Sequence, residues 1–374
     1  MKKNFLNPII FTVVSVFSIV IYLLTIVSAY GGHINPNTIS TPSLLCLFMP
    51  YLGLLSVILI IFWACCKNIF YTAFGVISLI ICIPSMSRAV PIGFPREGEA
   101  GKPEFTVISW NVLHTEDVRK PDYPGNRAVE FMVNSEADII CLTELYNFSP
   151  QELRKASTAL IDSLKTAYPY RAGLSSTDIK VISKYPVERM DLSLIDREGR
   201  HRFDFFKVKF PANELIVAMV HLYSYGLSDE ERNVVTEINS VKTAKKSVKE
   251  FKGSIMTKMK EAFRMRAENA SELRKIIDEI PEEQPLVVCG DFNDVPSSWT
   301  YNIISGDDMR DLYSETNIGP AFTYNLHRFY FHIDQMLYRG ALEGLSLKVG
   351  KINTSDHYPL IGKFQFTSPG QVGS

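Results

Sequence analysis

The sequence has no excess of charge of either sign. Its 374 residues include 39 Lys and Arg against 40 Asp and Glu, which gives a net charge of -1. This balance excludes a protein that binds nucleic acid mainly through bulk positive charge, although it allows a local basic surface. Charged residues make up 21% of the chain and hydrophobic residues 46%, which excludes intrinsic disorder.

Cysteine is also scarce, with six residues in the whole chain. Four lie in long apolar runs and two in short strand-like runs, and they are Cys46, Cys65, Cys66, Cys82, Cys141 and Cys289. This placement excludes a disulfide framework, and no Cys/His spacing typical of a zinc site is present. We therefore expect Cys141 and Cys289 to act as small buried side chains.

Charge is missing altogether from three stretches near the N-terminus, Pro8 to Tyr30, Leu44 to Cys66 and Ile69 to Pro84. Because about 20 apolar residues cross a bilayer core, these stretches predict three transmembrane helices, over about 8–30, 44–66 and 69–86. Residues 1–86 are thus expected to form a membrane anchor. A helical core buried in protein is an alternative for the region, and a cleavable signal peptide is one for the first helix.

The orientation of this anchor is predicted from the few charges beside it. Lys2, Lys3 and Lys67 would face the cytoplasm if the N-terminus is inside, which places the chain after Met86 outside the cytoplasm. Basic residues just after the third stretch oppose this reading, but long domains are translocated largely regardless of such charges. We expect an integral membrane protein with an extracytoplasmic domain.

The rest of the chain predicts one mixed α/β domain. Residues 87–104 are rich in Pro, Gly and charge, as in a juxtamembrane linker, and 367–374 are expected to form a flexible tail. From 105 to 366, apolar β-branched runs alternate with helical patterns, which predicts layered sheets with covering helices. The predicted strands are 105–110, 138–143, 179–184, 203–210, 215–221, 286–290, 332–338 and 358–364. The predicted helices are 126–135, 150–166, a long insertion over about 228–280, and a short one after Pro296.

Basic residues gather in one part of that insertion. Residues 239–266 hold nine Lys or Arg against two acids, Glu250 and Glu261. A basic helix beside a membrane anchor is suited to contact anionic lipid headgroups or to flank the path of a phosphorylated substrate. A solvated helix face is the simpler alternative.

Polar side chains follow several predicted strands at the point where each strand ends. They are Asn111, Glu144, His221, Asp291 and Asn293. Near the C-terminus come two further polar groups, His332 with Asp334 and the run Ser355-Asp356-His357. Strand ends can aim such groups into a shared crevice on rigid supports. Singly, each residue has an ordinary reading as a turn or structural side chain.

The residue types suit metal-assisted displacement at phosphorus. Glu144 is a hard oxygen ligand for Mg²⁺ or Mn²⁺, and Asn111 is placed to add an amide oxygen or to orient that ligand. Asp291 with Asn293 can hold a water or a phosphate oxygen. His357 is a candidate base or phosphate ligand, with a carboxylate such as Asp334 to set its tautomer.

Together these motifs resemble the endonuclease/exonuclease/phosphatase superfamily. The matching residues are Ser109-Trp-Asn111, Leu142-Thr-Glu144, Val220-His-Leu222, Gly290-Asp-Phe-Asn293, Ile333-Asp334 and Ser355-Asp-His357. The resemblance covers Phe105 to about Phe366 and says nothing about the apolar stretches. It implies a four-layer α/β/β/α sandwich of two packed mixed sheets, and hydrolysis of a phosphoester with a divalent metal.

The resemblance also implies a role for each matched residue. Glu144 would be the main metal ligand, with Asn111 near the metal and Asp356 a possible further ligand. His357 and Asp334 would form a histidine–carboxylate dyad.

The phosphate side of the site follows in the same way. Asp291 would position or deprotonate the attacking water, while Asn293 and His221 would bind the phosphate. Whether Asp291 or His357 is the base is left open. The family commonly has Arg before Ile-Asp and Tyr after it, where this chain has His332 and Gln335. His332 is therefore a candidate substrate contact that departs from the family pattern.

The leading hypothesis is a membrane-anchored, divalent-metal-dependent phosphoesterase. Its substrate would be a phosphodiester or phosphomonoester, with a lipid or another membrane-associated molecule as the candidate carrier. An anchored endonuclease or exonuclease is the nearest enzymatic alternative. A catalytically silent scaffold or binding module on the same fold is the alternative from another class.

Overall fold

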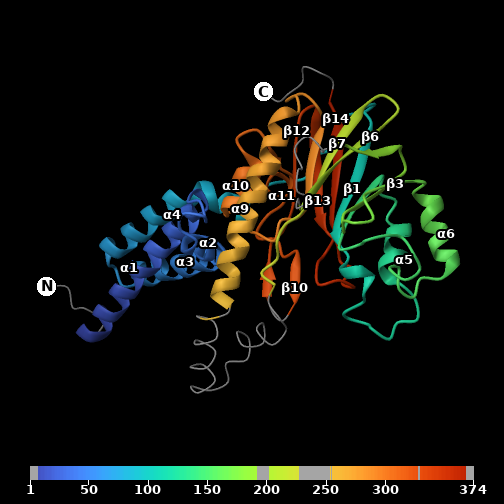
Figure 1. Ribbon diagram of the computed structural model, residues 1–374. Helices are drawn as coiled ribbons and strands as arrows, with labels where there is room; N and C mark the ends of the chain where they lie inside the picture. The colour runs from blue at the N-terminus through green and yellow to red at the C-terminus, as the bar shows by residue number, and fades with distance from the viewer. Residues whose placement is uncertain (1–6, 192–201, 227–252, 254, 327–328, 368–374) are drawn as a thin grey trace.

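The computed structural model describes residues 7–191, 202–226, 253, 255–326 and 329–367 (Figure 1). It confirms the predicted fold class, because two mixed six-stranded sheets lie face to face with helices outside them. Most of the basic insertion, from 227 to 252, and the predicted tail from 368 onward lie outside the described residues.

The first sheet is built around a parallel pair of strands. Its order is β13 (Leu342–Val349), β14 (Leu360–Phe366), β1 (Glu104–Asn111), β2 (Ile139–Thr143), β4 (Lys180–Ser183) and β3 (Tyr170–Ala172). Only β1 and β2 run parallel within it. Its outer face packs against α5 (Arg127–Asn134) and α6 (Thr158–Ala167). The helix predicted over 150–166 begins later than expected, at Thr158. The Ser157 side chain caps this start by accepting the backbone amide of Leu160.

The second sheet is also built around one parallel pair of strands. Its order is β5 (Val187–Arg189), β6 (Phe203–Lys209), β7 (Glu214–His221), β8 (Leu286–Asp291), β12 (Asp334–Arg339) and β9 (Arg310–Asp311). Strands β7 and β8 are parallel, and β12 is antiparallel to β8. Helices α9 (Met256–Glu279) and α10 (Trp299–Ser305) cover its outer face. A short helix, α11 (Leu312–Thr316), and the hairpin of β10 (Tyr324–Leu326) and β11 (Phe329–Phe331) complete this half.

The main core lies between the two sheets. It is formed by inward-facing apolar side chains of both sheets, among them Phe105, Val107, Phe206, Met219 and Met336. Cys141 and Cys289 belong to it as free, buried thiols, as the sequence predicted. Burial of this apolar surface is the chief source of stability for the sandwich.

The N-terminal region forms a bundle of α1 (Pro8–Tyr30), α3 (Met49–Cys65) and α4 (Ile69–Ala89), with η1 (Gly31–His33) and α2 (Thr41–Cys46) at one end. The prediction of three spanning helices is corrected here. The stretch 44–66 is broken between α2 and α3, and α3 has 17 residues, whereas α1 with η1 and α4 are long enough to cross a bilayer. Pro50 in the first turn of α3 explains the break, because proline suits a helix start and not a helix interior.

The bundle is fastened to the second sheet's half of the domain (Figure 1). The Asn302 side chain donates to the carbonyl of Gly32 (3.1 Å), and the Ser297 hydroxyl donates to the carbonyl of Cys46 (3.2 Å). The segment after α4, predicted as a linker, is hydrogen-bonded to the domain as well, with the amide of Gly93 donating to Asn317 and that of Phe94 to Glu315.

Candidate active site

Polar residues from both sheets meet at one edge of the sandwich. Asn111 ends β1, Glu144 follows β2, and His221 and Asp291 end the parallel strands β7 and β8. In the register of the second sheet, Asp291 lies beside His221 on one side and beside Asp334 on the other. Asp334 reaches the same edge because β12 begins there, antiparallel to β8.

A histidine–carboxylate pair lies on one side of Asp291. His357 Nδ1 is 2.8 Å from Asp334 Oδ2, and its Nε2 is 3.6 Å from Asp291 Oδ2. The loop that carries His357 is held by the indole of Trp110, which donates to the His357 carbonyl at 3.0 Å. The Asp334 bond therefore fixes which ring nitrogen faces Asp291.

A second pair lies on the other side. His221 Nδ1 is 2.7 Å from Asp178 Oδ2, and its Nε2 is 3.6 Å from Glu144 Oε1 and 4.0 Å from Asp291 Oδ2. The Asn111 side chain bridges the two remaining carboxylates, because its Nδ2 donates to Glu144 Oε1 at 2.9 Å and to Asp291 Oδ2 at 3.2 Å. Two imidazoles and one amide thus converge on the carboxylates of Asp291 and Glu144.

The backbone at the site adopts conformations that few residues tolerate. Gly290 has φ 140°, and an added Cβ would lie 1.9 Å from the Val220 carbonyl oxygen. Glu144 and Asn293 have φ 56° and 52°, in the left-handed region that disfavours side chains. Asn293 is held by two bonds, its amide to Asp291 Oδ1 at 2.8 Å and its Nδ2 to the Leu222 carbonyl at 3.0 Å.

Burial and mutual charge shift the acidity of these groups. Burial raises the pKa of Asp291 and the Asp334 charge raises it further, although His357 and His221 act to lower it. For His357, burial acts to lower the pKa, but Asp334 and Asp291 outweigh this and raise it well above its ordinary value. His221 shows the same balance, and its pKa is raised chiefly by Asp178.

The donor set fits a hard divalent cation. Within the described part of the chain, Asp291, Asp334 and His357 form one group whose ligand atoms all lie within 4.8 Å of one another. Asp334 and His357 already satisfy each other by a hydrogen bond, whereas Glu144 is partly exposed and is hydrogen-bonded through Oε1. A buried cluster with more carboxylates than imidazoles is relieved by a cation with oxygen ligands, such as Mg²⁺ or Mn²⁺.

The Asn111 side chain orients the two carboxylates. Its predicted place near the metal stays a prediction. Its Nδ2 points at Glu144 and Asp291, and its amide oxygen accepts the backbone amide of Leu113 at 3.1 Å. Asp356 is buried next to the dyad, where its Oδ1 lies 3.2 Å from the Ser355 hydroxyl. Its predicted role as a metal ligand stays a prediction.

His332 is not brought into this cluster. Its ring packs edge-on against Tyr313 at 4.9 Å, and neither ring nitrogen has a hydrogen-bond partner among the described residues. Burial lowers the pKa of His332 to about 3, so the ring is neutral at physiological pH. Because His332 is buried outside the cluster, its position does not favour the predicted contact with substrate.

Two site residues were missed by the sequence reasoning. Asp178 stands directly before the predicted strand at 179, which was the only local signal for it. Arg266 was counted with the basic helix face, but it is fully buried and its Nη1 donates to the Asn293 carbonyl at 2.6 Å. Its guanidinium also lies 3.4 Å from Asp294 and over the Tyr225 ring at 4.4 Å. It therefore anchors the loop that carries Asn293.

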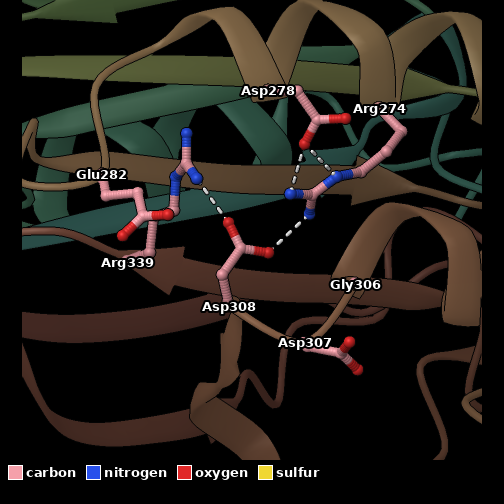
Figure 2. A pocket seen from close by; sticks show the side chains of 7 residues that line it. All are labelled: Arg274, Asp278, Glu282, Gly306, Asp307, Asp308 and Arg339. Atoms are coloured by element: carbon pink, nitrogen blue, oxygen red, sulfur yellow. Dashed lines mark hydrogen bonds and ion pairs between the residues drawn. The ribbon is translucent and has the colours of Figure 1, made fainter.

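A separate pocket lies away from these residues, between the C-terminal half of α9 and the loop after α10 (Figure 2). Asp308 pairs there with Arg274 at 2.7 Å and with Arg339, and Arg274 also pairs with Asp278 at 2.6 Å. Arg339 additionally donates to the carbonyls of Ile277 and Ile280 at the end of α9. These ion pairs and hydrogen bonds tie the end of α9 to the loop after α10, which gives the pocket a structural role.

The chain was also compared with known proteins. Among solved structures, the chain is similar to an endonuclease/exonuclease/phosphatase from Beutenbergia cavernae (16% identity, 71% of this chain and 72% of that one, TM-score 0.46). It is also similar to the human Nocturnin catalytic domain (16%, 71% and 96%, TM-score 0.45). A third match is a Staphylococcus aureus beta toxin mutant with bound magnesium ions (15%, 71% and 100%, TM-score 0.43). No curated protein matches.

Family models cover most of the chain. A domain of unknown function matches residues 9–89, and the model described as endonuclease/exonuclease/phosphatase family matches residues 108–357, which include every residue of the cluster described above. Members of that family are metal-dependent phosphoesterases or nucleases that act on phosphate ester bonds. The chain belongs to the endonuclease/exonuclease/phosphatase family, and it is a metal-dependent hydrolase of ester bonds.

Proposed function

We propose that this protein is a membrane-anchored phosphoesterase whose reaction takes place at the cluster around Asp291. The observation that carries the proposal is the convergence of His357 Nε2, His221 Nε2 and Asn111 Nδ2 on Asp291 Oδ2 and Glu144 Oε1. Such a set of preorganised donors and carboxylates suits hydrolysis at phosphorus.

The metal end of the site is assigned to Glu144, with Asp356 as a further ligand. When bound, a divalent cation supplies positive charge that stabilises the phosphoryl oxygens. Asn111 holds Glu144 and Asp291 in a fixed relation through its two hydrogen bonds.

The catalytic end is assigned to Asp291 and its neighbours. Asp291 Oδ1 is engaged by the Asn293 amide, so Oδ2 is the atom that faces the histidines and takes the proton of the attacking water. His357, fixed by Asp334, presents Nε2 to the phosphate, and His221, fixed by Asp178, does so from the other side. Asn293 retains a second amide proton for a phosphate oxygen.

The N-terminal bundle is assigned to a bilayer because its polarity is inverted. Ser18, Thr25 and Ser56 are buried inside it, where Thr25 and Ser56 hydroxyls lie 2.8 Å apart. Large apolar side chains point outward along its length, such as Val13 (62% exposed) and Leu54 (62%). Water disfavours this arrangement, whereas lipid favours it, since small and polar residues then mediate contact between helices.

The aromatic side chains support the same assignment. Tyr71 lies at the end of the bundle that is distant from the sandwich, where its ring stacks on the buried Trp63 with centroids 4.5 Å apart. Tyr30 and Tyr51 lie at the opposite end, where α1 stops and α3 starts. Aromatic belts of this kind mark the two interfaces of a membrane. The 17 residues of α3 are at the lower limit for a spanning helix, and we assign α3 to the bilayer together with α1 and α4. With three crossings, Lys67 in the turn at the distant end supports the proposed extracytoplasmic position of the catalytic domain.

The experiment that tests the function is hydrolysis by the purified full-length chain in lipid nanodiscs. The panel contains a generic soluble phosphodiester, plasmid DNA, RNA, inositol phosphates and phospholipids, each with Mg²⁺, with Mn²⁺ and with a chelator. Metal-dependent hydrolysis that is lost in Glu144→Ala supports the proposal. Cleavage of nucleic acid alone would assign an anchored nuclease, and equal rates with Glu144→Ala would refute the site.

A further inference from the structure

Large apolar side chains outside the bundle gather on one surface of the catalytic domain. Ile92 (81% exposed), Phe94 (64%) and Ile318 (64%) are followed by Phe322 (44%) and Tyr330 (45%). We call these five residues the apolar strip. Within the described part of the chain beyond residue 94, Ile318 is the one large apolar side chain that is more than half exposed. Such a surface is costly in water and marks a contact with a partner.

Contacts link the members of the strip in two groups. Ile92 and Ile318 form a β-bridge, and the amide of Gly319 donates to the Pro91 carbonyl at 2.9 Å. Four residues further on, the Phe322 ring meets the Tyr330 ring edge-on at 5.9 Å.

Both ends of the strip join the bundle. At one end, Ile92 stands three residues after Ala89, where α4 stops. At the other, the Tyr51 hydroxyl in the first turn of α3 donates to the Tyr330 carbonyl at 3.3 Å. The strip therefore runs along the catalytic domain between the points where α4 leaves and α3 enters the proposed bilayer.

The strip also adjoins the active site. Thr323, the residue after Phe322, accepts the backbone amide of Asp334 on its hydroxyl at 3.0 Å. The next residue, Tyr324, forms a β-bridge with His357, and their rings are 5.0 Å apart. The height of the strip relative to a membrane thus sets the height of the His357–Asp334 dyad.

We propose that the apolar strip lies in the interfacial layer of the bilayer and holds the active site at the level of the lipid headgroups. This inference rests on the proposed membrane anchoring and adds a substrate class to it, a phosphoester carried by a lipid headgroup. The occupant is lipid because the strip is bounded at both ends by helices whose outward side chains are apolar. Aromatic and aliphatic side chains are the types that partition into this layer.

The test is the depth of spin labels on the full-length chain in nanodiscs. Cys65 and Cys66 are replaced by serine, since the four other cysteines are buried. Single cysteines are then introduced by Ile318→Cys and, as a second position, Phe94→Cys. Two reference positions are Ile58→Cys in the middle of α3 and Leu174→Cys in the loop between β3 and β4, which are 53% and 42% exposed. Collision rates with oxygen and with a water-soluble nickel complex give the depth of each label.

We expect the oxygen-to-nickel ratio at residues 318 and 94 to be several-fold above that at 174 and below that at 58. Ratios at 318 and 94 equal to the ratio at 174, with a high ratio at 58, would overturn the strip and leave the anchor standing. A low ratio at 58 as well would overturn the membrane anchoring itself. None of these readouts depends on turnover, so they stand apart from a failure of the proposed hydrolysis.

Discussion

The Nδ1 atom of His221 lies 2.7 Å from Oδ2 of Asp178, and this pair joins the two sheets at the edge of the sandwich. His221 ends β7 of the second sheet, and Asp178 precedes β4 of the first. Because the bond engages Nδ1, the other ring nitrogen is aimed at Glu144 and Asp291. The pair mirrors the His357–Asp334 pair on the other side of Asp291, so one carboxylate is flanked by two oriented imidazoles.

Asp178→Asn should therefore lower turnover without unfolding the protein. The variant loses the charge that holds His221 in its tautomer, and changes of this kind typically cost about 10-fold to 100-fold in activity or metal affinity. The measurement is kcat and KM on whichever substrate of the panel is hydrolysed. Asp162→Asn is the matched control, because that acid is exposed on α6 and pairs only with exposed Lys165 among the described residues. Equal losses in both variants would contradict the role of Asp178.

Glu144→Ala should abolish metal-dependent turnover and weaken Mn²⁺ binding, measured by electron paramagnetic resonance of the free ion. Glu136→Ala is a closely matched control. Both glutamates have φ 56°, and they stand at opposite ends of β2, so both substitutions meet the same backbone strain. Turnover should persist in the Glu136 variant. Mn²⁺ binding that is unchanged in Glu144→Ala would remove this residue from the metal site.

His332→Phe should leave kcat within a few-fold of the parent value. The substitution removes both ring nitrogens but keeps an aromatic ring against Tyr313, and the nitrogens have no hydrogen-bond partner among the described residues. His357→Phe, measured alongside, should cost several orders of magnitude, because it removes the group fixed by Asp334. A comparable loss in both variants would restore the substrate contact predicted for His332.

Gly290→Ala should destabilise the fold strongly. The new Cβ would meet the Val220 carbonyl at 1.9 Å in addition to the strain of φ 140°, and such clashes belong to the rare losses above about 4 kcal/mol. Gly319→Ala separates the two causes, since its φ is 83° but no atom lies within 4 Å of the added Cβ. It should cost about 1–2 kcal/mol. Thermal unfolding in detergent measures both, and similar Tm values would show that the clash is relieved.

Acid should weaken the contact between α9 and the loop after α10 (Figure 2). Partial burial acts to raise the pKa of Asp308, but Arg274 and Arg339 outweigh it and lower the pKa below its ordinary value. The folded state then binds this proton less readily than the unfolded state. The stabilisation is present above the ordinary Asp pKa of about 4 and is lost as the pH falls through the lower folded value.

Asp308→Asn should therefore lower the Tm at neutral pH. Because the variant has no carboxylate at position 308 to protonate, acidification should lower its Tm by less than it lowers the Tm of the parent protein. Asp307→Asn is the matched control, since Asp307 is the exposed neighbour in the same loop. An acid-induced Tm loss that is the same in the parent and in Asp308→Asn would contradict the assignment.

Much of the fold and of the site followed from local pattern. The strands predicted over 138–143 and 286–290 are found at 139–143 and 286–291, because a strand buried on both faces is a short apolar run wherever it lies. Asn111, Glu144 and Asp291 were predicted because each stands at the end of such a run, and His357 because it stands directly before one. The long apolar stretches were equally visible, although only the structure divided the second at residues 47 and 48.

Contacts between residues far apart in the chain were decided only by the tertiary structure. Asp178 and His221 are 43 residues apart, and the sequence around either residue does not indicate that they pair. Arg266 has the charge of a surface residue, yet the Asn293 carbonyl and the Tyr225 ring make its burial favourable. The apolar strip joins residues 92, 318 and 330, which only the folded chain brings together. Composition and periodicity are properties of neighbours in sequence, whereas pairing across sheets depends on how the layers close on one another.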